Sequence, residues 1–254
     1  MAAGTDARDD FESALLALGE DPNPADLQAF LETHGRDKPR LIEALRRPLP
    51  GRLLEQIGDL RPLSDDARVA GALVQNPRTP LHVSRRLVSG LYWRDLAAAV
   101  ANPWIAAGLR QRAEALLLEQ LREMRLGDRV ALARIASVAI LRALLAETDA
   151  RLLEGALFNP RLQESMLLQG LRSDTAHVAL FEAVARSPRW RGTYAVRLEL
   201  VLHPRTPLPI ALAQVTSLVP ADLKRLAMAR GPHPLVRAAA ERALAPGPSR
   251  NSRR

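Results

Sequence analysis

The stretch Asn76-Pro77-Arg78-Thr79-Pro80-Leu81 decides the fold, because its two prolines separate one helix from the next. The residue before a proline is pushed out of the α region, so Asn76-Pro77 ends the helix that precedes it. Thr79-Pro80 then offers an N-cap followed by a proline at the first helical position, where a missing N–H costs little. The stretch therefore predicts a sharp turn between two short helices.

The same kind of turn recurs along the chain, as Asn159-Pro160-Arg161, Ser187-Pro188-Arg189 and His203-Pro204-Arg205-Thr206-Pro207, with a looser version at Asn102-Pro103-Trp104. Pro160 and Pro188 are 28 residues apart, but Pro188 and Pro204 are only 16 apart, which breaks the period. We interpret these motifs as structural turns of a repeat. The residues assigned to this role are Asn76, Pro77, Thr79, Pro80, Asn159, Pro160, His203, Pro204, Thr206 and Pro207.

A single shift of the sequence against itself, the one that places Asn76 on His203, aligns two longer segments without a gap. This repeat shift also places residues 77–81 on residues 204–208, Asp95 on Asp222 and Arg110 on Arg237. Agreement over about 40 residues indicates an internal repeat rather than chance. A helix pair with one apolar face cannot bury that face alone, so repeats of this kind stack on their neighbours.

The composition between these turns is that of helices. Ala, Leu, Arg and Glu dominate, and we find no alternating strand pattern. Asn23-Pro24-Ala25-Asp26 predicts a helix start, and Gly35 predicts its end. After Thr206, one apolar helical face is formed by Leu208, Ala211, Leu212, Val215 and Leu218.

Two short motifs resemble known repeat families. The Asn76–Pro80 turn with its Leu-rich helix resembles the leucine-rich repeat variant family, and residues 233–244, from His233-Pro234-Leu235-Val236-Arg237 onward, are similar to HEAT-like repeats. The resemblance covers residues 64–245 and implies an all-α fold, an α-solenoid of short helix pairs in a bacterial binding scaffold. The chain departs from the family in its irregular spacing, and it lacks the cysteines that accompany some leucine-rich repeat variants, so no cofactor is implied.

We expect three regions. Residues 1–62 lack the repeat and are expected to form an acidic helical cap, residues 63–245 the repeat domain, and residues 246–254 a disordered basic tail. The net charge of +8 is uneven: residues 1–35 hold eight acids and one base, which leaves +15 for the remainder. Arginine, which pairs with carboxylates and phosphates in a bidentate manner, supplies nearly all of the positive charge.

Aromatic residues are few and lie next to arginines. Candidate partner-binding residues are Tyr92, Trp93, Arg94, Trp104, Arg189, Trp190 and Arg191. Such residues can anchor a protein interface or stack on nucleic-acid bases. Filling of the core between repeats is the alternative. The segment Trp93-Arg94-Asp95 also suits the groove of a HEAT-like DNA glycosylase, which the chain resembles in architecture alone, or a plain helix start.

Nothing in the sequence indicates catalysis. There is no cysteine, the five histidines are widely spaced, and neither a nucleophile elbow nor a phosphate-binding glycine loop occurs. His82 has no evident partner. No membrane span is expected, and a cytoplasmic location follows by default. The leading hypothesis is a non-enzymatic scaffold without metal or cofactor that binds another protein, acidic in character. The alternative is nucleic-acid binding through a basic face, with a DNA-repair glycosylase as one form of it.

Overall fold

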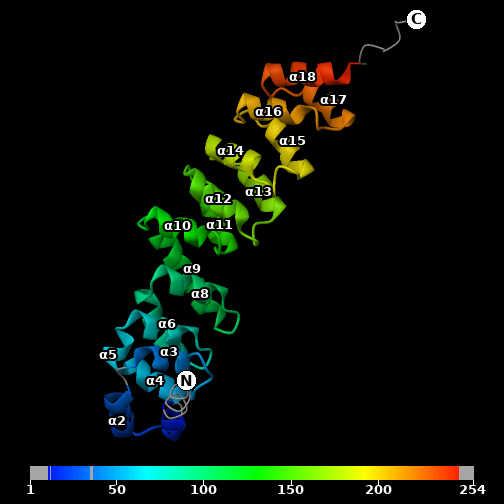
Figure 1. The fold of residues 1–254 in the computed structure, drawn as a ribbon. Helices are drawn as coiled ribbons and strands as arrows, with labels where there is room; N and C mark the ends of the chain where they lie inside the picture. The colour runs from blue at the N-terminus through cyan, green and yellow to red at the C-terminus, as the bar shows by residue number, and fades with distance from the viewer. Residues whose placement is uncertain (1–10, 12, 35–36, 246–254) are drawn as a thin grey trace, which may run out of the picture. The chain divides into compact units, whose positions relative to one another are not determined.

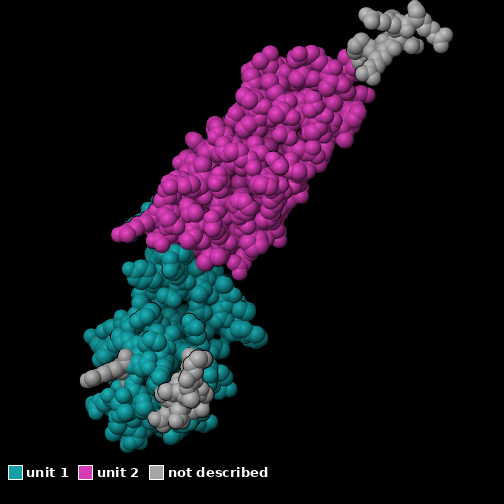
Figure 2. Space-filling view, viewed as in Figure 1, with its two compact units in different colours: residues 1–123 teal, residues 124–254 magenta. Residues whose placement is uncertain are grey.

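The computed structural model describes residue 11, residues 13–34 and residues 37–245. Every regular element in this part of the chain is a helix, as the sequence predicts (Figure 1). None of these described helices is long and apolar enough to cross a membrane. The chain divides into two compact units, residues 1–123 and residues 124–254 (Figure 2). The boundary expected at residues 62 and 63 falls inside the first unit and stays a prediction, and the tail 246–254 lies outside the described residues.

In the first unit, helices that alternate along the chain contact one another and form two rows. The helices α3, α6 and α8 contact one another in order, and α4, α7 and α9 form the second row beside them. The helices are α2 (Pro24–His34), α3 (Lys38–Leu45), α4 (Gly51–Asp59), α5 (Arg61–Ser64), α6 (Ala67–Gln75), α7 (Leu81–Leu87), α8 (Trp93–Ala101) and α9 (Ala107–Gln120), with a 3₁₀ turn at Val88–Gly90.

In the second unit, alternate helices also contact one another. The helices α10, α12 and α14 contact one another in order, α13 contacts α15, and α16 contacts α18. The helices are α10 (Leu126–Ala133), α11 (Val138–Leu144), α12 (Ala150–Phe158), α13 (Glu164–Leu171), α14 (Val178–Arg186), α15 (Tyr194–Leu202), α16 (Leu208–Val215), α17 (Pro220–Met228) and α18 (Pro234–Leu244).

Helix starts follow the capping signals in part. The helix α2 begins at Pro24 as predicted, and the Asn23 side chain accepts a hydrogen bond from the Ala25 N–H at 3.1 Å. Gly35, predicted to end this helix, lies outside the described residues. Asp149 caps α12 by accepting hydrogen bonds from two backbone N–H groups of its first turn, at 2.9 and 3.2 Å.

The expected N-caps Thr79 and Thr206 are wrong by one residue. The helices α7 and α16 begin at Leu81 and Leu208, with Pro80 and Pro207 in the cap position. The Thr79 hydroxyl instead donates to the Leu73 carbonyl at 2.6 Å, so it closes the end of α6 rather than the start of α7. A threonine hydroxyl can donate to a carbonyl as well as accept from an N–H group, and Thr79 donates.

The apolar face predicted after Thr206 packs as expected. Ala211, Val215 and Leu218 are buried in one cluster with residues of α15, α17 and α18, and Leu208 and Leu212 are partly buried against it. Leucine dominates both cores, as in α4 and α12, where the buried residues include Leu53, Leu54, Leu152 and Leu153. Apolar burial of this kind is the main stabilising contribution to such helices.

The repeat shift matches helix starts in both units. The helices α6, α7, α8 and α9 begin at positions 67, 81, 93 and 107, and α15, α16, α17 and α18 begin at 194, 208, 220 and 234. Each start in the second set therefore follows its counterpart by the same interval that separates His203 from Asn76. Arg110 and Arg237, aligned by the same shift, each bond a backbone carbonyl of the turn before their own helix.

Candidate functional site

The asparagines of the Asn-Pro-Arg turns join each turn to the one before it. In the second unit, Nδ2 of the fully buried Asn159 donates to the carbonyls of Ala133 and Ala136 at 2.8 and 3.1 Å. Its Oδ1 accepts the backbone N–H of Arg161 at 2.9 Å. One amide group thus satisfies buried carbonyls of the preceding turn and holds its own turn, which a hydrocarbon side chain cannot do.

Asn76 plays the same part in the first unit. Its Nδ2 donates to the carbonyls of Leu45 and Arg47, both at 2.7 Å, and its Oδ1 accepts the N–H of Arg78 at 3.0 Å. Asn102 also bonds the preceding turn, through the Gln75 carbonyl at 2.9 Å. The first unit therefore links three successive turns with asparagine amides.

The arginine of each motif reaches back as well. Arg161 donates to the Ile135 carbonyl at 2.8 Å, and Arg189 donates to the carbonyls of Asn159 and Leu162 at 2.7 and 2.8 Å. Carbonyls near a helix C-terminus carry partial negative charge and attract a guanidinium without neutralising it. Across the described part of the chain, neither arginine forms an ion pair with a carboxylate, so the positive charge stays at this surface.

These bonds define a continuous surface that we call the turn edge, made of residues 133–137, 158–163 and 187–191. It carries further exposed arginines, Arg134 and Arg191, for which no ion pair occurs within the described residues. Two large apolar side chains are also exposed there, Ile135 at 52% and Phe158 at 63%. The turn edge therefore combines uncompensated positive charge with apolar area.

The motif that breaks the period has a structural explanation. Ser187-Pro188-Arg189 precedes α15 and His203-Pro204-Arg205 follows it, so one helix instead of a pair separates the two motifs. Arg205 consequently bonds the carbonyls of Asp174 and Ala176, at 2.5 and 3.1 Å, rather than any residue of the turn edge.

The aromatic candidates divide into buried and exposed residues. Trp93 and Trp190 are buried, and Trp190 Nε1 donates to the Leu157 carbonyl at 3.0 Å. The guanidinium groups of Arg94 and Arg189 lie 5.2 and 4.4 Å from the ring centres of these tryptophans, whereas Arg191 is exposed. Tyr92 and Trp104 are exposed at 71% and 78%, so within the described residues only these two candidate rings are open to a partner.

Sequence reasoning missed Ile135 and Phe158. A signal for Phe158 was available, since the buried face of α12 is formed by Leu152, Leu153, Ala156 and Leu157, and position 158 lies off that face. Ile135 follows the last turn of α10, in a loop where helical periodicity does not apply, and its carbonyl accepts from Arg161 of a later turn. No periodicity in the sequence carries that information.

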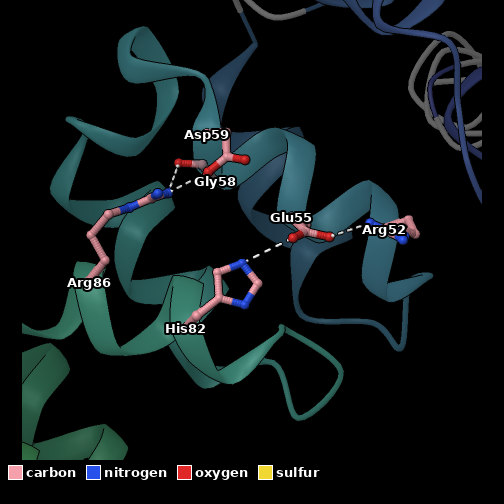
Figure 3. A network of polar contacts seen from close by, with 6 residues as sticks. All are labelled: Arg52, Glu55, Gly58, Asp59, His82 and Arg86. Carbon is pink, nitrogen blue, oxygen red and sulfur yellow. Dashed lines mark hydrogen bonds and ion pairs between the residues drawn. The ribbon is translucent and has the colours of Figure 1, made fainter.

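A set of polar contacts links α4 to α7 in the first unit (Figure 3). His82 Nε2 lies 3.0 Å from a Glu55 carboxylate oxygen, and Arg86 Nη2 donates to the Gly58 carbonyl and the Asp59 carboxylate, both at 2.8 Å. The contacting residues are four apart on each helix, so the two contacts lie side by side. Most of the His82 side chain is exposed, and contacts of this kind in water contribute little stability.

The first unit has a hollow next to these contacts, and the second unit has a cleft. The hollow, of about 490 Å³, has charges of both signs from Asp59, Asp65, Arg61 and Arg86 in its wall. The cleft, of about 320 Å³, lies beside the C-terminal ends of α11 and α13 and has Arg142 as its one charged lining residue. Among the described residues, no group of three His, Asp or Glu side chains is placed to hold a metal ion.

Comparisons with known proteins return nothing similar. No family model matches the chain, and neither the curated proteins nor the solved structures include a significant match.

Proposed function

We propose that this chain is a non-enzymatic scaffold of the α-solenoid kind, which binds an acidic segment of another protein at the turn edge. Two observations support the architectural part. Helix starts recur under the repeat shift, and asparagine amides bond each turn to the preceding one within a unit. A stack of this kind leaves its turns and one helix row free for a partner.

The binding part rests on one observation, the uncompensated arginines beside exposed apolar side chains. Arg161 and Arg189 are held by backbone carbonyls, so their positions are fixed while their charge remains. A partner carboxylate can pair with such a guanidinium in a charge-assisted hydrogen bond. Apolar side chains of the same partner would cover Ile135 and Phe158, each worth roughly 1.5–3 kcal/mol when fully buried.

The turn edge suits a protein better than a nucleic acid. Of its two exposed apolar side chains, Phe158 has a ring on which a base can stack but aliphatic Ile135 does not, so apolar side chains of a protein segment would cover more of this area. A nucleic acid would instead draw on phosphate contacts, whose affinity falls steeply with salt. The salt dependence of binding therefore separates the two partner classes.

The test measures binding of the full chain to a short fluorescent peptide rich in glutamate with one leucine, and to a single-stranded oligonucleotide, across a salt series. The double variant Phe158→Ser/Arg191→Gln removes one apolar side chain and one charge from the turn edge. Met228→Ser/Arg230→Gln is the matched control, because Met228 and Arg230 are an exposed pair outside the turn edge.

We expect the turn-edge variant to weaken peptide binding about tenfold or more, a change of roughly 1.4 kcal/mol, and the control to leave it unchanged. Equal effects of the two double variants would assign binding to net charge and overturn the proposal. Oligonucleotide binding with a steep salt slope, in the absence of peptide binding, would replace it with the nucleic-acid alternative.

A further inference from the structure

The cleft of the second unit has a floor formed by close packing. Gly170 of α13 lies against Leu145, and a Cβ at this glycine would stand 3.2 Å from Leu145 Cδ1. Buried Leu145, Met166 and Ala176 make the apolar floor. A volume of about 320 Å³ is at the small end of ligand pockets and fits one side chain rather than a cofactor.

The rim of the cleft supplies hydrogen-bond donors and one positive charge. Arg142 lines it, and throughout the described residues this side chain has neither a hydrogen bond nor an ion pair. The hydroxyls of Ser173 and Thr175 lie 2.8 Å apart, so one proton holds the pair together and the other is left to donate. The Gln169 amide adds further donors. No carboxylate lines the cleft, so its charge complements an anion.

One helix, α11, leads from the turn edge to the cleft. Val138 and Arg142 are four residues apart on this helix and therefore share a face, and Val138 is exposed at 41%. Their separation along the helix axis is about 6 Å, which an extended peptide spans in about two residues. Ile135 of the turn edge lies just before the start of α11.

From these features we infer that the cleft takes the side chain of a glutamate in the acidic segment that the turn edge binds. The methylene groups would lie on the floor of Leu145, Met166 and Ala176, and the carboxylate would pair with Arg142 and the Ser173–Thr175 hydroxyls. An apolar residue of the segment would lie on Val138 and Ile135, about two residues away. This inference rests on the proposed function, and it adds which residues the bound segment must carry: a glutamate and, about two residues away, an apolar residue.

The test uses the full chain and two cleft variants. Arg142→Gln removes the charge, and Ala146→Phe fills the mouth of the cleft from an exposed position. Arg230→Gln and Ala213→Phe are the matched controls, because both residues are exposed in the same unit and neither lines the cleft. The probe is the fluorescent glutamate-and-leucine peptide, with a second peptide in which the glutamates two residues from the leucine on either side are replaced by glutamine.

We expect Arg142→Gln and Ala146→Phe each to weaken binding of the glutamate peptide about tenfold, and the control variants to leave its binding unchanged. Arg142→Gln should leave binding of the glutamine peptide unchanged, because the carboxylate it pairs with is already missing. Wild-type affinity in both cleft variants, together with lost affinity in Phe158→Ser/Arg191→Gln, would overturn the cleft and retain the proposed function. Failure of the wild-type chain to bind either peptide would overturn both. A circular-dichroism melting curve for each variant shows that the fold is retained.

Discussion

The carboxyl group of Asp95 lies directly over the backbone of Gly71, and a Cβ at residue 71 would stand 2.9 Å from both Cγ and Oδ1 of Asp95. The first turn of α8 thus packs on α6 through a glycine. Burial at this contact raises the pKa of Asp95. Asp222, which the repeat shift aligns with Asp95, is held differently, because it accepts a hydrogen bond from the Tyr194 hydroxyl at 2.5 Å. Equivalent turns of the two units therefore hold their aspartates by different means.

Gly71→Ala should destabilise the protein by about 1–3 kcal/mol, because the new methyl group overlaps the Asp95 carboxyl. Adding Asp95→Ala removes the carboxyl, whose Cγ and Oδ1 are the nearest atoms, and leaves Cβ of residue 95 at 3.4 Å. We expect the double variant to recover most of the loss. Urea unfolding of the two single variants and the double variant gives the coupling energy. Simple additivity of the two changes would contradict the contact.

The sequence predicts those features that depend on neighbouring residues. Proline positions mark the ends of α6, α12 and α15, and the repeat shift anticipates how the starts of α15 to α18 correspond to those of α6 to α9. The all-helical fold and the buried face of α16 follow from composition and periodicity. Local rules suffice for these features because a helix boundary is decided by residues within one turn of it.

The candidate site depends on contacts that sequence spacing does not reveal. His82 and Glu55 meet at 3.0 Å although they lie on different helices, and Arg161 bonds the carbonyl of a residue 26 positions earlier. The exposed and buried tryptophans likewise look alike in sequence, since Trp104 and Trp190 both follow a proline turn. Trp190 is buried where its Nε1 donates to the carbonyl of Leu157 in α12, a residue 33 positions earlier, and no local spacing reveals that contact.

Asn159 should be among the most sensitive positions of the second unit. Asn159→Ala removes the donor from the carbonyls of Ala133 and Ala136, and each buried carbonyl left unpaired costs about 1–3 kcal/mol. Asn159→Asp should cost more, because it places a carboxylate against the same two carbonyls. The exposed Gln163→Ala, at the same turn, is the control and should change stability by less than about 0.5 kcal/mol. A denaturant midpoint that is lowest for Asn159→Asp, intermediate for Asn159→Ala and highest for the wild type would support this role. Equal midpoints for all four proteins would refute it.

The two aligned threonines should respond oppositely to valine. The Thr79 hydroxyl donates to the Leu73 carbonyl at 2.6 Å, so Thr79→Val should destabilise the protein by about 1 kcal/mol. The buried Thr206 hydroxyl has no hydrogen-bond partner among the described residues, and Thr206→Val should stabilise the protein by about 1 kcal/mol. Thermal unfolding of both variants measures the difference directly. A loss of stability in Thr206→Val would show that this hydroxyl is satisfied in solution.

His203 stands where Asn76 stands in the aligned turn, and it should make stability depend on pH. Burial next to the Phe181 ring, whose centre is 4.6 Å away, lowers the pKa of His203. The negative charge of Glu199 opposes this shift and the positive charge of Arg205 adds to it, and the net direction is downward. The folded state therefore holds the neutral ring, whose Nδ1 accepts the backbone N–H of Arg205 at 3.2 Å. An unfolded histidine with a pKa of 6.5 takes up a proton more readily. The contribution of this group is accordingly complete above pH 6.5 and is lost as the pH falls below it toward the folded-state pKa.

His203→Asn restores an amide that accepts the same N–H group and cannot be protonated. We expect the variant to lose less stability than the wild type between about pH 7 and pH 5, so that its relative stability rises as the solution becomes acidic. Urea unfolding at several pH values in this range measures the difference. His233→Asn is the matched control, because His233 Nδ1 accepts the Leu235 N–H at the same 3.2 Å from an exposed position. If the wild-type and His203→Asn curves stay parallel across the range, His203 takes up its proton equally in both states and the burial argument fails.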